Sequence, residues 1–279
     1  WDKAIKDCKY VMHIASPFPM KVSNDREKLL PVAVDGTLRV LKSSIKNNVE
    51  QIIVTSSIVA MFRKPNRSNP YTFGENDWTD ENWIEGVSDY FLSKTKAEKA
   101  AWRLMESKGL KNKLTTINPG GVFGDALDKK GGTSIEYIRQ FMKGKFPGAP
   151  KFAVLISDVK DIAKAHVACI GNNKVGGRRL IVGKDVKRLV ELSQLIAEAM
   201  PEYKKKLPTK ELPNLMVKLI SYIDSSAKTM IPDLGIMMQT DTSYAEEILG
   251  FKFKPAKGCI SENARSVVRL GLVLSLIHI

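Results

Sequence analysis

A continuous β-branched run, Gln51-Ile-Ile-Val-Thr55, constrains the fold of this chain more than any other feature of the sequence. Strands in the middle of a parallel sheet are buried on both faces, so their sequences are unbroken apolar runs. The run follows a segment, Pro31 to Lys46, that carries apolar residues at helical spacing. Strand and helix patterns then keep alternating without hairpin signals. The sequence therefore predicts an α/β fold with a doubly wound parallel sheet.

The same patterns predict the other elements. The polar segment 63–88 has no regular period and is expected to form a long functional loop over one end of the sheet. Beyond Pro201 the pattern is mostly helical and predicts a smaller lobe. Expected strands are Tyr10–Ile14, Lys113–Asn118, Phe152–Ile156 and Arg179–Val182, and expected helices are Tyr90–Ser107, Thr133–Lys143, Asp158–Ile170 and Val190–Met200.

The charge and the cysteines restrict the partners of the protein. The formal net charge is +14, but the lysines are spread along the chain, so we expect a solvated basic surface rather than a nucleic-acid site. No apolar run reaches the roughly 18 residues that a membrane span needs. Cys8, Cys169 and Cys259 are odd in number and far apart, which fits a reducing compartment and neither a disulfide framework nor a zinc site. We expect a cytoplasmic protein.

Small and hydroxyl residues follow three of the expected strands, at Ala15-Ser16, Ser56-Ser57 and Pro119-Gly120-Gly121. Ligands of a doubly wound sheet bind at the carboxyl ends of its strands. Each segment alone also fits a turn or a helix cap. Together with a helix that carries Tyr90 and Lys94, they predict a site for a flat cofactor and a carbonyl group.

Tyr90 and Lys94 are four residues apart on an expected helix, so their side chains share one face. A buried lysine beside a tyrosine favours the phenolate and lowers the tyrosine pKa from about 10 toward neutrality. Reduction of a carbonyl group needs such an acid. The spacing by itself is also common on solvated helix faces.

In these segments the sequence resembles the extended short-chain dehydrogenase/reductases of the NAD-dependent epimerase/dehydratase superfamily. Within them it is most similar to the dihydroflavonol, cinnamoyl-CoA and aldehyde or methylglyoxal reductases. The matching segments keep the family order over about two-thirds of the chain. They are His13–Pro17, Val34–Thr37, Val40–Lys42, Thr55–Ser57, Tyr90–Lys94 with Ala97-Glu98, Asn118–Gly124 and Asp158–His166.

The resemblance implies reduction of a ketone or aldehyde by hydride transfer from NADP or NAD. It implies that Ser57 binds the substrate oxygen, with Ser56 as the alternative, that Tyr90 donates the proton, and that Lys94 lowers the tyrosine pKa and holds the nicotinamide ribose. No metal is expected. The implied cofactor-binding residues are Ile14, Ala15, Ser16, Tyr90, Lys94, Pro119, Gly120, Gly121, Val122 and Ser134.

The glycine-rich G-x-x-G-x-x-G segment of the family does not occur in this chain. We expect two preceding βα units, about 60 residues, to be missing, and the chain as given to bind cofactor poorly. The expected parts are a partial dinucleotide-binding domain at 1–150, a region at 151–273 with the final sheet elements and a substrate-binding lobe, and a non-native tail at 274–279.

Several side chains keep two interpretations. His166 is expected to be a packing or surface residue, and Asp158 and Asp161 to begin a helix. Six apolar residues predict either an apolar mouth of the pocket, and hence an apolar aldehyde or ketone substrate, or ordinary core. They are Phe18, Pro19, Met20, Met61, Phe62 and Phe123.

The same triad also occurs in nucleotide-sugar epimerases or dehydratases and in hydroxysteroid dehydrogenases. The former need a site for the substrate diphosphate, for which the sequence offers no clear candidate. A non-catalytic NAD(P)-sensing regulator on the same fold is a third alternative, which the presence of both Tyr90 and Lys94 disfavours.

Overall fold

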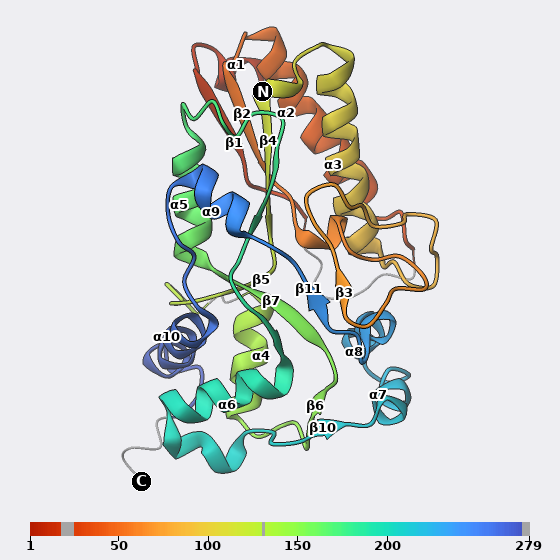
Figure 1. The fold of residues 1–279 in the computed structure, drawn as a ribbon, viewed down its shortest axis with the longest axis vertical. Coiled ribbons are helices and arrows are strands. Elements are labelled where there is room, and N and C mark those ends of the chain that lie inside the picture. The colour runs from red at the N-terminus through yellow and green to blue at the C-terminus, as the bar shows by residue number, and fades with distance from the viewer. Residues whose placement is uncertain (18–24, 130–131, 275–279) are drawn as a thin grey trace.

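The centre of the molecule is a four-stranded parallel sheet in the order β1-β2-β4-β8 (Figure 1). The computed structural model describes residues 1–17, 25–129 and 132–274. The predicted run Gln51–Thr55 pairs on both sides, with Ile53 opposite Met12 and Thr115, which confirms its central place. The four strands are β1 (Tyr10–His13), β2 (Gln51–Thr55), β4 (Leu114–Pro119) and β8 (Arg179–Val182).

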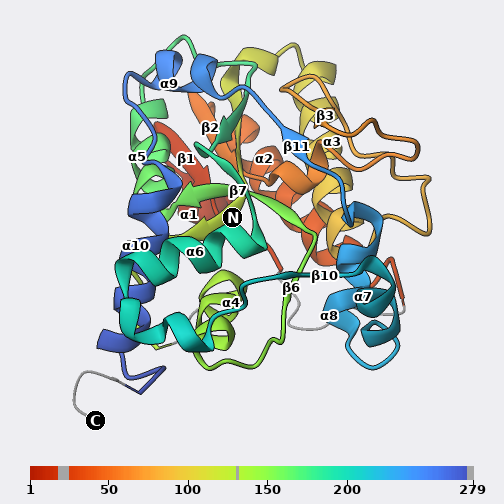
Figure 2. The ribbon, with the colours of Figure 1, turned by 60° about the horizontal axis from the view of Figure 1, so that its bottom comes forward.

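Helices cover both faces of this sheet, as Figures 1 and 2 show. Ile52 and Val54 of β2 face one layer, and Ile53 between them belongs to the core on the other side. Successive strand residues point to opposite faces, and here both faces are apolar. The predicted doubly wound fold is therefore confirmed. One layer is α1 (Asp2–Ile5), α2 (Gly36–Lys46) and α3 (Asp89–Ser107), and the other is α5 (Val159–Cys169) and α9 (Ser243–Leu249).

A second core lies at the carboxyl end of the sheet, because β5 begins two residues after β4 ends. There a small sheet in the order β5-β7-β9 packs against three helices, with β5 parallel and β9 antiparallel to β7. Figure 2 shows these helices in front, with α7 and α8 to one side. The strands are β5 (Gly121–Phe123), β7 (Ala153–Asp158) and β9 (Val186–Arg188), and the helices are α4 (Thr133–Met142), α6 (Leu189–Ala199) and α10 (Ala256–Arg269).

Elements from both sides of residue 150 contribute to both cores. Helix α4 packs with α6 and α10, whereas α5 packs on the main sheet and β8 is one of its strands. The division of the chain into 1–150 and 151–273 stays a prediction, and only Leu274 of the expected tail lies within the described residues. The remaining α-helices and strands of the described residues are α7 (Asn214–Ile220), α8 (Ser225–Met230) and the parallel pairs β6 (Ala149–Pro150) with β10 (Glu211–Leu212) and β3 (Tyr71–Thr72) with β11 (Met238–Gln239).

The segment 63–88 contains no helix and only the two-residue strand β3, as its irregular sequence predicted. Arg63, which is 1% exposed, fixes the segment to the C-terminal part of the chain. Its guanidinium donates to both Gly86 O and the Asp233 carboxylate. Buried charges need such partners, so this pair holds the loop in place.

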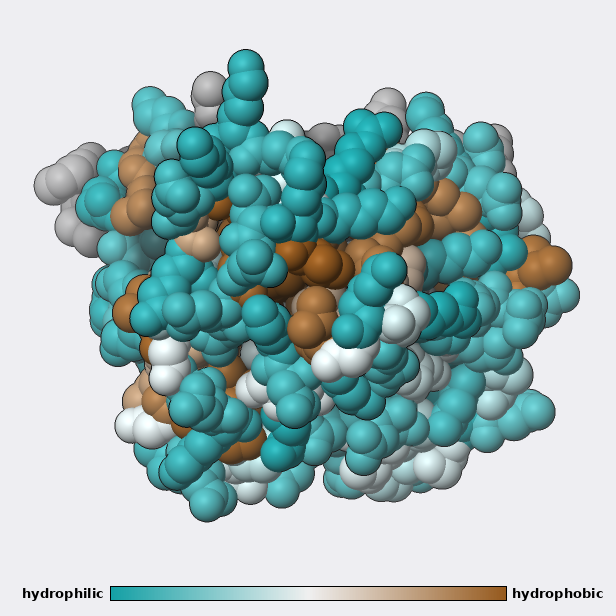
Figure 3. Space-filling view, turned by 90° about the horizontal axis from the view of Figure 1, so that it is seen from above, coloured by the Kyte–Doolittle hydropathy of each residue, from teal (hydrophilic) through white to brown (hydrophobic). Residues whose placement is uncertain are grey.

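The surface agrees with the expected solvation of the charged side chains. Figure 3 shows a face that is mostly hydrophilic, with apolar side chains gathered near its middle. No helix in the described part of the chain combines the length and the apolar character needed to cross a bilayer.

We predict that Gly120→Ala destabilises the fold by about 1–3 kcal/mol. A Cβ atom at Gly120 would lie 2.3 Å from the carbonyl oxygen of Leu155, so β5 and β7 would have to separate. Urea denaturation measures the effect. Gly36→Ala is the matched control, because a Cβ there meets nothing within 4 Å and alanine favours the helix. Equal stability changes in the two variants would contradict the prediction.

Candidate active site

The ends of β2 and β4 meet at Ser57. Its hydroxyl donates to Pro119 O over 3.4 Å, and Asn118 Nδ2 donates to Ser57 O over 3.2 Å. Ser57 Oγ also accepts from Val59 N, which caps the short turn that follows the strand. The structure thus brings together two of the three strand ends that the sequence singled out.

Tyr90 reaches this point from the first turn of α3. Burial raises the pKa of Tyr90 to about 12, although a hydrogen bond with Ser57 acts in the opposite direction. The expected shift of the Tyr90 pKa toward neutrality by Lys94 is therefore wrong for this structure. The reason is that burial of the phenol is the dominant influence on its pKa, and Ser57 rather than Lys94 supplies the opposing one.

Lys94 lies one turn further along α3 and is 8% exposed. Burial lowers the pKa of Lys94 to about 8, and the charge of Glu98 opposes this shift. The amine makes no hydrogen bond or ion pair with the described residues. It faces a small cavity that Ala15, Ser16 and Thr37 also line.

Ser57 and Tyr90 line a larger cavity of about 610 Å³. Four further residues that the resemblance implied for cofactor binding lie along it, namely Gly120, Gly121, Val122 and Ser134. Ala15, Ser16 and Lys94 line the small cavity instead, and Ser56 does so as well. Ile14 is 58% exposed and lines neither cavity.

The apolar residues proposed for the pocket mouth divide between the two interpretations. Phe62 and Phe123 line the larger cavity, next to Phe91 and Met238. Met61 is fully buried in the core. Phe18, Pro19 and Met20 lie outside the described residues.

Glu98 is the residue that sequence reasoning missed. Its buried carboxylate accepts hydrogen bonds from Ser56, Asn118 and Arg179. Burial raises the pKa of Glu98, but Arg179 and the neutral donors lower it further, so the carboxyl stays below its ordinary range. Glu98 follows Lys94 by four residues on the same helix face, and this spacing could have identified it from the sequence.

His166, Asp158 and Asp161, for which the sequence left a structural interpretation open, have structural roles. His166 is 5% exposed, and its Nε2 lies 2.7 Å from Thr55 Oγ1, which confirms a packing residue. Asp158 accepts from Lys160 N and caps α5, and Asp161 lies in the first turn of that helix, as predicted. Within the described ranges no group of three or more acidic, histidine or cysteine side chains could hold a metal ion.

Comparison with known proteins gives consistent matches. The sequence model of the 3-beta hydroxysteroid dehydrogenase/isomerase family matches residues 1–171. The NADPH-dependent methylglyoxal reductase GRE2 of Saccharomyces cerevisiae is 31% identical over 283 residues, covering 95% of this chain and 78% of that protein. Cinnamoyl-CoA reductase 1 of Petunia hybrida is 28% identical over 270 residues, covering 96% of this chain and 73% of that protein.

The solved structures agree with this result. Yeast methylglyoxal/isovaleraldehyde reductase Gre2 complexed with NADPH superposes with a TM-score of 0.75 at 28% identity. That match covers 98% of this chain and 80% of the other. Gre2 from Candida albicans, also in complex with NADPH, gives a TM-score of 0.76 at 26% identity, with 96% and 79% covered.

We predict that Glu98→Gln destabilises the fold by about 3 kcal/mol, because it leaves the Arg179 charge buried without its counter-ion. Denaturant titration gives the difference. Glu106→Gln is the matched control on the same helix, since its pair with Lys111 is exposed and is expected to change stability by less than about 0.5 kcal/mol. Similar losses in both variants would show that Glu98 is an ordinary surface partner.

Proposed function

The chain belongs to the 3-beta hydroxysteroid dehydrogenase/isomerase family of the extended short-chain dehydrogenase/reductases, and on this premise we propose that it is an NADPH-dependent reductase that converts a ketone or aldehyde into an alcohol. The observation that carries the proposal is the hydrogen-bonded pair Ser57 and Tyr90 facing a large, mainly apolar cavity. The NADPH-dependent relatives and the NADPH-bound Gre2 structures support the choice of cofactor.

The residues present fit the nicotinamide half of such a cofactor. Lys94 offers a buried amine without an acceptor among the described residues, and a ribose hydroxyl would supply one. The backbone of Gly120 to Val122 borders the cavity beside Ser57. When bound, NADPH supplies the hydride. Lys94, the strand end at 119–122 and Ser134 are the residues that we assign to holding it.

The protein groups then act on the carbonyl oxygen. The Ser57 hydroxyl donates a hydrogen bond to it, and Tyr90 transfers its proton as negative charge develops there. A Tyr90 pKa of about 12 keeps this proton in place at neutral pH, so the phenol is present in the form that can donate it. With a pKa of about 8, Lys94 is mostly charged at pH 7, so its ammonium would donate to the ribose hydroxyls of a bound cofactor.

The walls of the larger cavity support an apolar substrate. Phe62, Phe91 and Met238 border the space beside Tyr90, and Phe152 and Val154 continue it. Apolar side chains stabilise an aromatic or branched aliphatic group and leave a sugar diphosphate without partners. We therefore propose an apolar aldehyde or ketone as the substrate class. The three free cysteines support a reducing, cytoplasmic location.

We expect Tyr90→Phe to lower kcat at least about 100-fold, because the carbonyl oxygen loses its proton donor. The measurement is NADPH oxidation by the full-length protein against a panel of apolar aldehydes and ketones. Tyr137→Phe is the matched control, since burial raises the pKa of Tyr137 to about 12 as well, but this tyrosine lines neither cavity. Unchanged turnover in Tyr90→Phe would refute the assigned mechanism, and no turnover by the unmodified protein would refute the function.

We also expect kcat/KM for NADPH to be constant below about pH 8 and to fall above it. Lys94 is cationic below its pKa of about 8 and loses its charge as the pH rises through that value. This parameter reports groups of the free enzyme. Lys94→Arg keeps the charge, so its residual activity is expected to lack the decline near pH 8. The same decline in both proteins would assign it to another group.

A further inference from the structure

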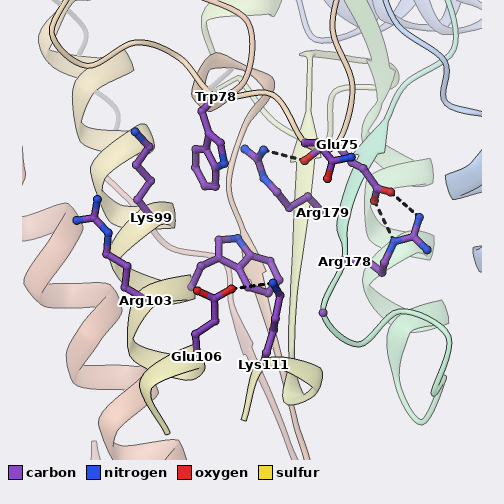
Figure 4. A pocket seen from close by; sticks show the side chains of 11 residues that line it. Glu75, Trp78, Lys99, Arg103, Glu106, Lys111, Arg178 and Arg179 are labelled. Carbon is purple, nitrogen blue, oxygen red and sulfur yellow. Dashed lines mark hydrogen bonds and ion pairs between the residues drawn. The ribbon is translucent and has the colours of Figure 1, made fainter. Parts of the chain in front are cut away.

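A cavity of about 400 Å³ lies between α3, the loop that contains Trp78 and the start of β8 (Figure 4). It shares no residue with the two cavities of the candidate active site. Its charged lining is mainly cationic, and two indole rings form part of its wall. The charged residues are Lys99, Arg103, Lys111, Arg178, Arg179, Glu75 and Glu106, and the indoles are Trp78 and Trp102.

Arg179 has an unused donor at this cavity. The residue is 7% exposed and its guanidinium carbon lies 3.7 Å from the centre of the Trp78 ring. Nε donates to Glu98 and Nη1 donates to the backbone oxygens of Glu75 and Asp77. Nη2 is buried and has no acceptor in the described part of the chain. Figure 4 shows this guanidinium beside the Trp78 ring.

Leaving a buried charged donor unsatisfied is unfavourable, because the group has lost its water without gaining an acceptor. Nε and Nη1 of Arg179 are paired, so Nη2 is the nitrogen that still needs an acceptor. An acceptor that enters the cavity from outside would complete the set. The cavity wall therefore contains a buried hydrogen-bond donor, Nη2 of Arg179, in addition to charged side chains at the surface.

Arg103 adds uncompensated positive charge for the same ligand. Arg103 is exposed and has no ion pair among the described residues. The two lining carboxylates are already occupied, Glu75 by Arg178 and Glu106 by Lys111, each over 2.7 Å. Two carboxylates outside the lining also offset part of the positive charge of the site, since Glu98 pairs with Arg179 and Glu81 lies 3.6 Å from Lys99. Even with these included, the cations exceed the carboxylates.

We propose that this cavity binds a phosphate-bearing small molecule. Guanidinium groups match the several oxygens of a phosphate, and Arg179 and Arg103 would hold it from the bottom and the rim of the cavity. The indoles of Trp78 and Trp102 provide a surface for a planar ring attached to the phosphate. The site is separate from the reductase chemistry and stands whether or not that function is confirmed.

Intrinsic fluorescence tests the proposal, because two of the four tryptophans line the cavity. Inorganic phosphate, ribose 5-phosphate and AMP are titrated into the protein. We expect saturable changes at millimolar concentration or below, with AMP tightest if the indoles contact a ring, and weaker binding as NaCl is added. Phosphate and AMP binding equally would assign the site to the free anion instead of a nucleotide-like ligand.

Arg103→Gln is the decisive variant, and it is expected to weaken binding about 10-fold through loss of a charge-assisted contact. Arg265→Gln is the matched control, an exposed helical arginine on α10 that also lacks an ion pair within the described ranges. Lys111→Gln is expected to lower the affinity for the same probes independently. Equal affinities in Arg103→Gln and Arg265→Gln, or no saturable change with any probe below about 10 mM, would overturn the proposal.

Discussion

The buried ion pair between Glu98 and Arg179 is the interaction on which the rest of the structure depends. The Glu98 carboxylate lies inside the contact of α3 with the sheet and accepts from Ser56 after β2, from Thr116 and Asn118 of β4, and from Arg179 of β8. One helix is thereby tied to three parallel strands. A charge in this position is unfavourable unless all its partners are in place, so the geometry around it has little freedom.

This fixed point sets the orientation of the whole helix. Tyr90, Lys94, Glu98 and Trp102 follow one another at intervals of four residues, so they lie along one face of α3. Because Glu98 is locked to the strand ends, Tyr90 is brought to Ser57 and Lys94 to the small cavity beside it. Toward the C-terminal end of α3 the same face places Trp102 in the wall of the cavity that Trp78 also lines. Trp102 Nε1 also donates to Glu98. Glu98 thus lines the small cavity and holds Arg179 and Trp102 in the wall of the cavity that contains Trp78.

Local patterns were enough to predict the elements that carry these residues. The strands Gln51–Thr55 and Arg179–Val182 occur with the predicted bounds, since an apolar run between turn signals has few other solutions. The polar partners could not be predicted in this way. Arg179 begins an apolar strand, and only the return of β8 beside β4 brings it within 2.6 Å of Glu98, which is 81 residues away. Periodicity contains no information about such long-range contacts, and for the same reason the packing of α4 with α6 and α10 was not foreseen.

The expected shift of the Tyr90 pKa was wrong because burial of the phenol outweighs the effect of a neighbour on the same helix face. Burial disfavours the charged form of any group, so it raises the pKa of Tyr90 and lowers that of Lys94. The pKa of one group rises and that of the other falls, but both shifts favour the neutral side chain. Ser57 opposes the shift of the Tyr90 pKa and Glu98 opposes that of the Lys94 pKa, so neither of the two groups offsets the desolvation of the other. The protein alone therefore holds the phenol protonated and the amine close to its titration, and a ligand that spans both cavities would be needed to join them into one catalytic unit.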